Sequence, residues 1–188
     1  MINLRINLNI NLAKRLGSAV LSSLLFSSLV ISSGCHHKSA PKQDLNGKSI
    51  SIRQMITDAG GIIITQGSRL QIILPTDEFF EAQSTEIIEE QLDTLELVSL
   101  YLKDFLKTHP SRQHVYVTAY TDTVYTPKQR QALSEQYAQV IASYLWSQGF
   151  SHRVLTVAGY GASYPIADQS TAAGSHANRR VQIDVLPR

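Results

Sequence analysis

The residue with the clearest chemistry is Cys35, the only cysteine of this 188-residue chain. It follows an N-terminal stretch with three basic residues, no acidic residue and an apolar or small run from residue 16 to residue 31. A positive start, a short apolar segment and small residues before a cut site are typical of a secretory signal. The sequence therefore predicts a signal peptide over residues 1–34. Its removal would leave Cys35, a nucleophilic thiol, at the new N-terminus.

The segment around Cys35 resembles the signal of bacterial lipoproteins, in which the cysteine thiol is diacylated. That signal prefers leucine three residues before the cysteine, where this chain has Ser32. The resemblance implies a lipid anchor on Cys35, with several acyl chains acting together. His36 stands where an aspartate would retain an enterobacterial lipoprotein in the inner membrane, which implies the outer membrane and a domain facing the periplasm. The alternative is an ordinary secreted protein with a stray thiol, which would be a liability in an oxidising compartment.

No other residues combine into a catalytic or metal-binding set. His36 and His37 adjoin a polar linker without a third ligand nearby, and the acids between residues 86 and 96 fit the solvated face of a helix. Ser111 and His114 precede an expected strand without a base and an orienting group. We therefore expect no enzyme activity, no metal site and no cofactor.

The charge of the chain argues against a nucleic-acid partner. The whole chain carries a net charge of +2, from 17 basic and 15 acidic residues. Removing residues 1–34 takes away three basic residues and no acidic one, which leaves a net charge of −1. Without a basic excess, neither nucleic acid nor anionic lipid is an expected partner. We expect a lipidated N-terminus and tether over residues 35–59 and a single domain over residues 60–188.

The elements that would position a site alternate between strands and helices. Short β-branched runs bounded by glycine or proline predict strands, and residues 66–68 read as a hairpin turn between the first two. We expect strands over residues 62–65, 69–74, 114–120, 154–158 and 181–186, a short helix over residues 50–59 and a polar loop over residues 163–177. Together with two long helices, this order predicts an α/β sandwich of the α+β kind, with helices packed on one mixed sheet.

Those two long helices carry the clearest local signals. Over residues 84–109, apolar side chains recur in steps of three and four, interrupted only at serine 99, while acids crowd the first half and lysines the last turns. Thr126, Pro127 and Gln129 are typical of a capped helix start. This second helix is expected to end at Gly149.

Five short motifs resemble the C-terminal domain family of OmpA, whose members are periplasmic modules that bind peptidoglycan. In order, the motifs are a strand end with two phenylalanines at residues 74–80, Thr121-Asp122, Leu133-Ser134-Glu135 with Ala138, Gly159-Tyr160-Gly161 with Pro165, and Asn178-Arg179-Arg180-Val181. Together they cover residues 60–188 approximately. The resemblance implies a peptidoglycan-binding α+β sandwich without enzyme activity.

In that family the ligand is the diaminopimelate of the wall stem peptide, whose D-amino-acid centre bears an ammonium and a carboxylate. The resemblance assigns Asp122, beside Thr121, to the ammonium. The family's carboxylate-binding arginine is replaced here by Tyr137, and the asparagine seven residues before it by Arg130. The glycine of the family's loop is replaced by Tyr125. A tyrosine hydroxyl donates one hydrogen bond, where arginine offers a two-pronged charged contact worth roughly 1.5–3 kcal/mol.

Two hypotheses follow from this substitution. In the first, Arg130 supplies a relocated cation, because residues seven apart on a helix share one face with Tyr137. In the second, Arg130 pairs only with Asp122 or solvent, and the pocket no longer binds the wall. Arg179 and Arg180 alternate at a strand, so one of them would form an ion pair at the edge of the core. Arg180 is then a candidate to face wall carboxylates.

Two functions remain open. The first is an outer-membrane lipoprotein that holds peptidoglycan through its domain. The second is a structural docking subunit that keeps the fold without wall binding. A short lipoprotein with this altered motif also resembles the OmpA-domain lipoprotein of type IVB secretion systems. That resemblance implies other envelope and secretion-complex proteins as partners, and a role in virulence.

Overall fold

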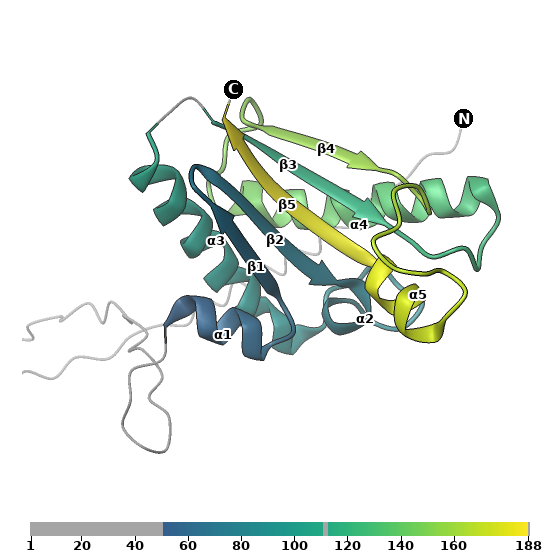
Figure 1. The fold of residues 1–188 in the computed structure, drawn as a ribbon. Helices are drawn as coiled ribbons and strands as arrows, with labels where there is room; N and C mark the ends of the chain where they lie inside the picture. The colour runs from purple at the N-terminus through teal and green to yellow at the C-terminus, as the bar shows by residue number, and fades with distance from the viewer. Residues whose placement is uncertain (1–50, 111–112, 188) are drawn as a thin grey trace, which may run out of the picture. The chain divides into compact units, whose positions relative to one another are not determined.

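The computed structural model describes residues 51–110 and 113–187. The expected signal peptide, Cys35 and the tether up to residue 50 lie outside the described residues. The described residues belong to one compact unit, a five-stranded sheet with helices (Figure 1). The predicted sandwich of helices on a mixed sheet is confirmed. Within residues 51–110 and 113–187, no helix is long and apolar enough to cross a membrane.

The last strand of the chain lies in the middle of the sheet. The strands are β1 (Ile62–Gln66), β2 (Arg69–Pro75), β3 (Gln113–Tyr120), β4 (Leu155–Gly159) and β5 (Arg180–Pro187). The helices are α1 (Ile52–Asp58), α2 (Thr76–Phe79), α3 (Leu92–Thr108), α4 (Pro127–Ser147) and α5 (Ala172–Asn178), with a 3₁₀ turn at Glu89–Gln91. The strand order is β1-β2-β5-β3-β4, in which only β3 and β4 run parallel. The final strand thus separates β2 from β3.

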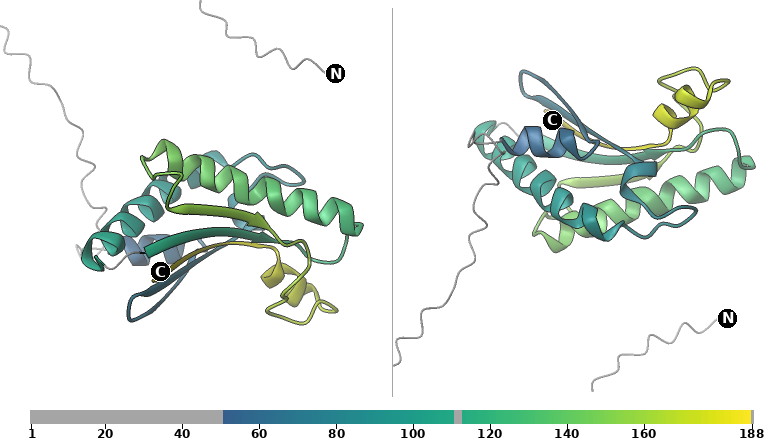
Figure 2. Two further views of the ribbon diagram at one scale, coloured as in Figure 1. Left: turned by 90° about the horizontal axis from the view of Figure 1, so that it is seen from above. Right: turned by 90° about the horizontal axis from the view of Figure 1, so that it is seen from below.

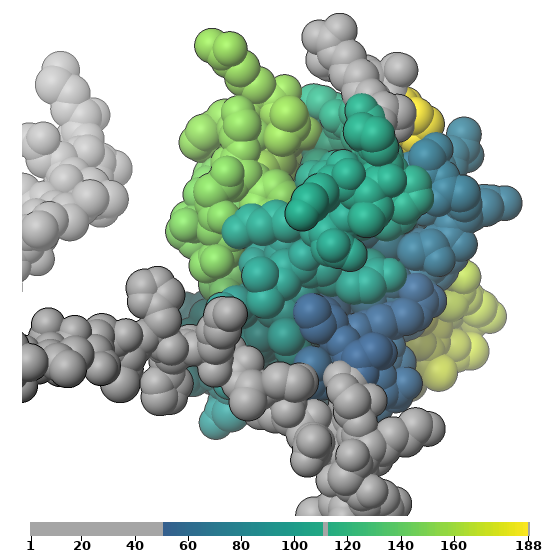
Figure 3. Space-filling view, turned by 90° about the vertical axis from the view of Figure 1, so that its left-hand side faces the viewer, coloured from purple at the N-terminus to yellow at the C-terminus, as the bar shows by residue number. Residues whose placement is uncertain are grey.

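The core lies between one face of the sheet and two long helices. Figure 2 shows α3 and α4 on this face and α5 on the opposite side. Val115 and Val117 of β3 point into the core and are fully buried, as the alternation of the strand predicts. Each large apolar side chain buried here contributes roughly 1.5–3 kcal/mol relative to exposure. At one end of the domain α1 packs against α3 and β1 (Figure 3).

The capped start predicted for the second long helix is confirmed. The Thr126 hydroxyl accepts from the backbone N–H of Gln129 at 3.4 Å, and the Gln129 side-chain oxygen accepts from the Thr126 N–H at 3.1 Å. Pro127 is the first residue of α4. Gly149 adopts a φ of 92°, which glycine tolerates best, and ends the helix as expected. These local contacts fix the point at which the chain leaves the loop after β3.

The first long helix begins later than the sequence predicts. It starts at Leu92, whereas the apolar spacing predicted a start at residue 84. Residues 80–88 instead fold back on themselves, with a β-bridge between Phe80 and Ile87. The Ile88 N–H also donates to the Phe79 carbonyl at 3.1 Å. Packing of these apolar side chains against the core therefore outweighs the local helical pattern.

The buried face of α3 also differs at two positions from the predicted apolar stripe. Leu92, expected on the apolar stripe, is 40% exposed. Ser99, the predicted interruption of the apolar stripe, is fully buried on the same face of the helix. Its hydroxyl donates to the Glu96 carbonyl at 2.8 Å, so the buried hydroxyl has a hydrogen-bond acceptor.

The short helix α5 was not predicted, because residues 163–177 read as a polar loop. It begins after Thr171, whose hydroxyl accepts from the Gly174 N–H at 3.0 Å. Its seven residues are alanine, glycine and polar residues without an apolar stripe, so periodicity could not reveal it. The threonine cap was the one local signal available.

Candidate functional site

Three chain segments meet at one end of the sheet. The last residues of β2 and β3 both pair with Arg180, the first residue of β5. Because β5 is antiparallel to both neighbours, the residues that follow β2 and β3 lie beside the residue that precedes β5. Those residues are Asp77, Asp122 and Arg179. The register of the sheet thus brings together two acids and a base that are far apart in the sequence.

Arg179 forms ion pairs with both acids. Its Nε donates to Asp77 Oδ1 at 2.9 Å and its Nη2 to Asp77 Oδ2 at 2.5 Å. Its Nη1 donates to Asp122 Oδ2 at 2.6 Å. Asp122 is only 3% exposed, and its other oxygen accepts from the Val124 N–H at 3.1 Å. On the outer side, Nδ1 of His176 in α5 lies 2.8 Å from Asp77 Oδ2.

These contacts hold the charges of the acid–base cluster in place. The hydrogen bond from Arg179 lowers the pKa of the Asp77 carboxyl, with a smaller contribution from His176, while partial burial opposes the shift. The two acids in turn raise the pKa of Arg179, with Asp77 the larger cause. The guanidinium therefore stays protonated and is paired with both Asp77 and Asp122.

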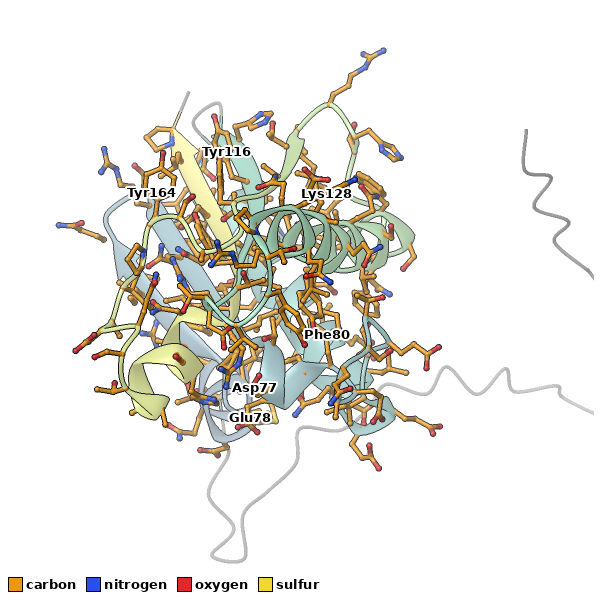
Figure 4. The ribbon with its side chains drawn as sticks, turned by 90° about the vertical axis from the view of Figure 1, so that its right-hand side faces the viewer. Asp77, Glu78, Phe80, Tyr116, Lys128 and Tyr164 are labelled. Atoms are coloured by element: carbon orange, nitrogen blue, oxygen red, sulfur yellow. The ribbon has the colours of Figure 1, made fainter. Side chains whose placement is uncertain are left out.

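A pocket of about 570 Å³ opens beside this cluster. Figure 4 shows Asp77 and Phe80 at this end of the domain, with Asp77 beside α5. The lining residues come from α2 and the segment after it, the end of β3 and its loop, α4, and the residue before β5: Thr76, Asp77, Phe80, Glu81, Ala82, Gln83, Ile88, Tyr120, Thr121, Asp122, Val124, Tyr125, Leu133, Tyr137 and Arg179. Within residues 51–110 and 113–187, no group of three histidine, cysteine or acidic side chains could hold a metal ion.

Three of the site residues named from the sequence line this pocket: Thr121, Asp122 and Tyr137. The Thr121 N–H donates to the Gly161 carbonyl at 2.8 Å, which fixes the loop after β3 to the turn after β4. Tyr137 is 9% exposed, and its ring centroid lies 4.6 Å from that of Phe80. The position at which the resemblance places an arginine is therefore part of an aromatic wall.

The other two candidates lie outside the lining. Arg130, proposed as the relocated cation, donates from Nη1 to the Thr123 carbonyl at 3.3 Å. Arg180 is 2% exposed, lies 3.8 Å from the centroid of the Tyr120 ring and donates to the Tyr164 carbonyl at 3.2 Å. The ion pair expected from one of the two neighbouring arginines is that of Arg179. Whether Arg130 or Arg180 contacts a ligand stays a prediction.

Sequence reasoning missed several contributors to the pocket, among them Asp77 and Phe80. Asp77 and Phe80 both lie in the motif at residues 74–80, but their part in the site was not recognised. Asp77 and Arg179 are 102 residues apart, so only the pairing of β2 with β5 reveals their contact. An acid two residues past a strand end was the available signal.

The strand order, the helices on one face and the acid-lined pocket at the strand ends define a domain of the OmpA C-terminal-like class. Comparison with known proteins agrees: the sequence profile described as "OmpA family" matches residues 79–179. The chain belongs to the OmpA family, as its motifs predicted.

Individual relatives are similar over parts of their length. "Probable lipoprotein YiaD" of Escherichia coli is 31% identical over 136 residues, which are 72% of this chain and 60% of the relative. "Peptidoglycan-binding protein ArfA" of Mycobacterium tuberculosis is 35% identical over 82 residues, which are 44% of this chain and 25% of that protein. The chain thus spans less than two thirds of either relative. A solved structure of the cell wall anchor of the T6SS from Pseudomonas aeruginosa shares the fold, with a TM-score of 0.59 and 23% identity over 73% of this chain and 98% of that one.

Proposed function

We propose that this chain is an outer-membrane lipoprotein whose OmpA-like domain binds peptidoglycan noncovalently. The observation that carries the proposal is Asp122, a buried acid in the lining of a pocket that Arg179 holds in place. A fixed carboxylate with low exposure binds an ammonium group more strongly than a solvated one does. The ammonium of diaminopimelate in the wall stem peptide is the ligand group of this kind. Membership of the OmpA family and the relative named as a peptidoglycan-binding protein support the same function.

Co-sedimentation with purified peptidoglycan sacculi tests wall binding. We use a soluble fragment of residues 40–188, which form one compact unit. We expect the fragment to pellet with sacculi, and Asp122→Ala to reduce the bound fraction at least about tenfold, the scale of one charged hydrogen bond. Asp104→Ala, an exposed acid of α3 outside the pocket, is the matched control and should pellet like the parent. Circular dichroism of each variant confirms that it is folded.

A second function is favoured by a specific observation. Tyr137 takes the place of the family's arginine, and the guanidinium of Arg179 is already paired with two acids. Under this alternative the domain is a docking subunit of an envelope secretion complex, of the type IVB kind, and its partners are other proteins of that complex. If neither the parent fragment nor the variants pellet, wall binding is rejected and the docking function is retained.

The lipid anchor is a separate part of the proposal. Cells fed a radiolabelled fatty acid should incorporate the label into the full-length protein. Cys35→Ala should abolish the label and release the protein from the membrane fraction, because the buried acyl chains provide the membrane affinity. Ser39→Ala, a polar residue close by, is the control. A label that persists in Cys35→Ala would show that the protein is not a lipoprotein acylated at Cys35.

A further inference from the structure

The pocket carries an excess of negative charge. Among the described residues that line it, three are acidic, Asp77, Glu81 and Asp122, and one is basic, Arg179. The formal charge of the lining is therefore −2. His176 contacts Asp77 from outside the lining. Such a lining attracts cations and repels anions at short range.

Arg179, the one basic residue among the described lining residues, is already paired with two acids of the protein. Arg179 donates from Nε and Nη2 to Asp77 and from Nη1 to Asp122, so three of its five N–H groups face carboxylates within the protein. A ligand carboxylate that approached Arg179 would compete with these two acids and be repelled by both. Among the described residues, the two remaining N–H groups of Arg179 face no carboxylate and can donate to a neutral acceptor.

The walls of the pocket are aromatic. Phe80, Tyr125 and Tyr137 contribute rings to the lining, whereas the ring of Tyr120, also in the lining, is covered by Arg180 and stacked with Tyr160. The faces of such rings attract ammonium groups, and the attraction grows when the site is partly desolvated. Burial raises the pKa of the Tyr137 hydroxyl, and Tyr125 and Asp77 add smaller contributions. This hydroxyl therefore remains a neutral donor of a single hydrogen bond, which suits a carbonyl oxygen.

We propose that the pocket selects a peptide that carries an ammonium group whose neighbouring carboxylate is masked as an amide. The inference rests on the proposed wall-binding function and defines its ligand. The ammonium lies against the negatively charged lining and the aromatic wall, and the amide carbonyl accepts from Tyr137 or from an N–H of Arg179 that faces no carboxylate. A free carboxylate at the same place would meet a negative lining without an unpaired cation. Tyr137 and Asp77 are the residues that set this specificity.

Titration calorimetry with two synthetic stem peptides tests the inference. Both peptides are L-alanyl-γ-D-glutamyl-diaminopimelate, and they differ only in whether the carboxylate beside the side-chain ammonium is free or amidated. The full-length protein in detergent micelles is titrated at pH 8. We expect the amidated peptide to bind about tenfold more tightly, the scale of one charged hydrogen bond. Equal or tighter binding of the free acid would overturn the inference and leave wall binding intact.

Two variants extend the test. Tyr137→Arg should remove or reverse the preference by raising the affinity for the free acid, whereas Gln136→Arg places the same charge on an exposed neighbour in α4 and should leave the preference unchanged. If Tyr137→Arg does not fold, Asp77→Asn provides the second variant, because it releases Arg179 from one acid. If neither peptide binds the parent protein, the inference is rejected. Co-sedimentation with sacculi then shows separately whether wall binding survives.

Discussion

Replacing Arg179 with alanine is expected to destabilise the folded domain by about 3 kcal/mol, the scale of breaking a buried ion pair from one side. The change leaves Asp122 buried at 3% exposure with only the Val124 N–H as a hydrogen-bond donor among the described residues. Asp77 keeps only its contact with His176 among the side chains described. An unpaired buried carboxylate is costly because it has exchanged water for an apolar surrounding. Urea unfolding followed by circular dichroism at neutral pH measures the change.

Arg153→Ala provides the control for this measurement. Arg153 is an exposed arginine before β4, outside the pocket, and its replacement should alter the free energy of unfolding by less than about 0.5 kcal/mol. If Arg179→Ala lowered the free energy of unfolding by less than about 1 kcal/mol, the ion pairs of Arg179 would be no stronger than solvent-screened pairs on the surface. The cluster would then be too weak to hold Asp122 in position for a ligand.

The pH dependence of stability gives a second readout of the same variant. In the parent protein, Arg179 lowers the folded-state pKa of Asp77 from 3.8. A depressed carboxyl pKa contributes stability that is present above pH 3.8 and is lost as the pH falls through the lowered value. Without Arg179 the pKa of Asp77 returns toward its ordinary value, so this contribution disappears. The difference in stability between parent and variant should therefore narrow as the pH falls below 3.8.

The elements that were predicted correctly depend on local chemistry. The start of α4 is fixed by Thr126 and Gln129, which lie three residues apart, and its end by Gly149. The strands follow β-branched runs whose side chains alternate between faces. The predicted start of α3 was wrong because Ile88 fits the helical stripe, yet Ile87 and Ile88 are held in an extended turn by backbone contacts with the phenylalanines at residues 80 and 79. A contact of this kind cannot be read from periodicity.

In the candidate site, too, some residues could be predicted from local sequence and others could not. Thr121 and Asp122 could be named from a short motif, and both line the pocket. The choice between Arg179 and Arg180 could not be made, because alternation states only that the two point apart. The side chain of Arg179 is positioned by its ion pair with Asp77. Only the register between β2 and β5 brings these two residues together. Local sequence thus predicted the acid of the site, whereas the partner that holds it depends on long-range pairing.

Gly159→Ala is expected to destabilise the domain by about 3 kcal/mol or more, because it overpacks a rigid contact between backbones. A Cβ atom at this position would lie 2.2 Å from the backbone nitrogen of Glu135 and 2.6 Å from the backbone carbonyl carbon of Ser134. Neither atom belongs to a flexible side chain, so β4 and α4 would have to move apart. Glycine is required here by the close approach of strand and helix.

Gly67→Ala is the matched comparison for this effect. Gly67 lies in the β1–β2 turn with a φ of 58°, and a Cβ atom there would meet no atom within 4 Å. Its replacement should cost only the left-handed conformation, about 1–2 kcal/mol. Urea unfolding measures the loss in the free energy of unfolding for both variants. The difference between the two losses separates the steric overlap at Gly159 from the conformational effect at Gly67. If Gly159→Ala proved no more destabilising than Gly67→Ala, the strand–helix contact would be looser than its distances indicate.

The effect of Gly159→Ala should also reach the pocket. Two residues further on, the Gly161 N–H donates to the Ser134 hydroxyl at 2.9 Å, and the Gly161 carbonyl accepts from the Thr121 N–H at 2.8 Å. A shift of β4 away from α4 therefore displaces Thr121 and the adjoining Asp122. We expect folded Gly159→Ala protein to bind sacculi more weakly than the Gly67→Ala protein, although neither glycine lines the pocket. Equal binding would show that the loop after β3 is positioned independently of the turn after β4.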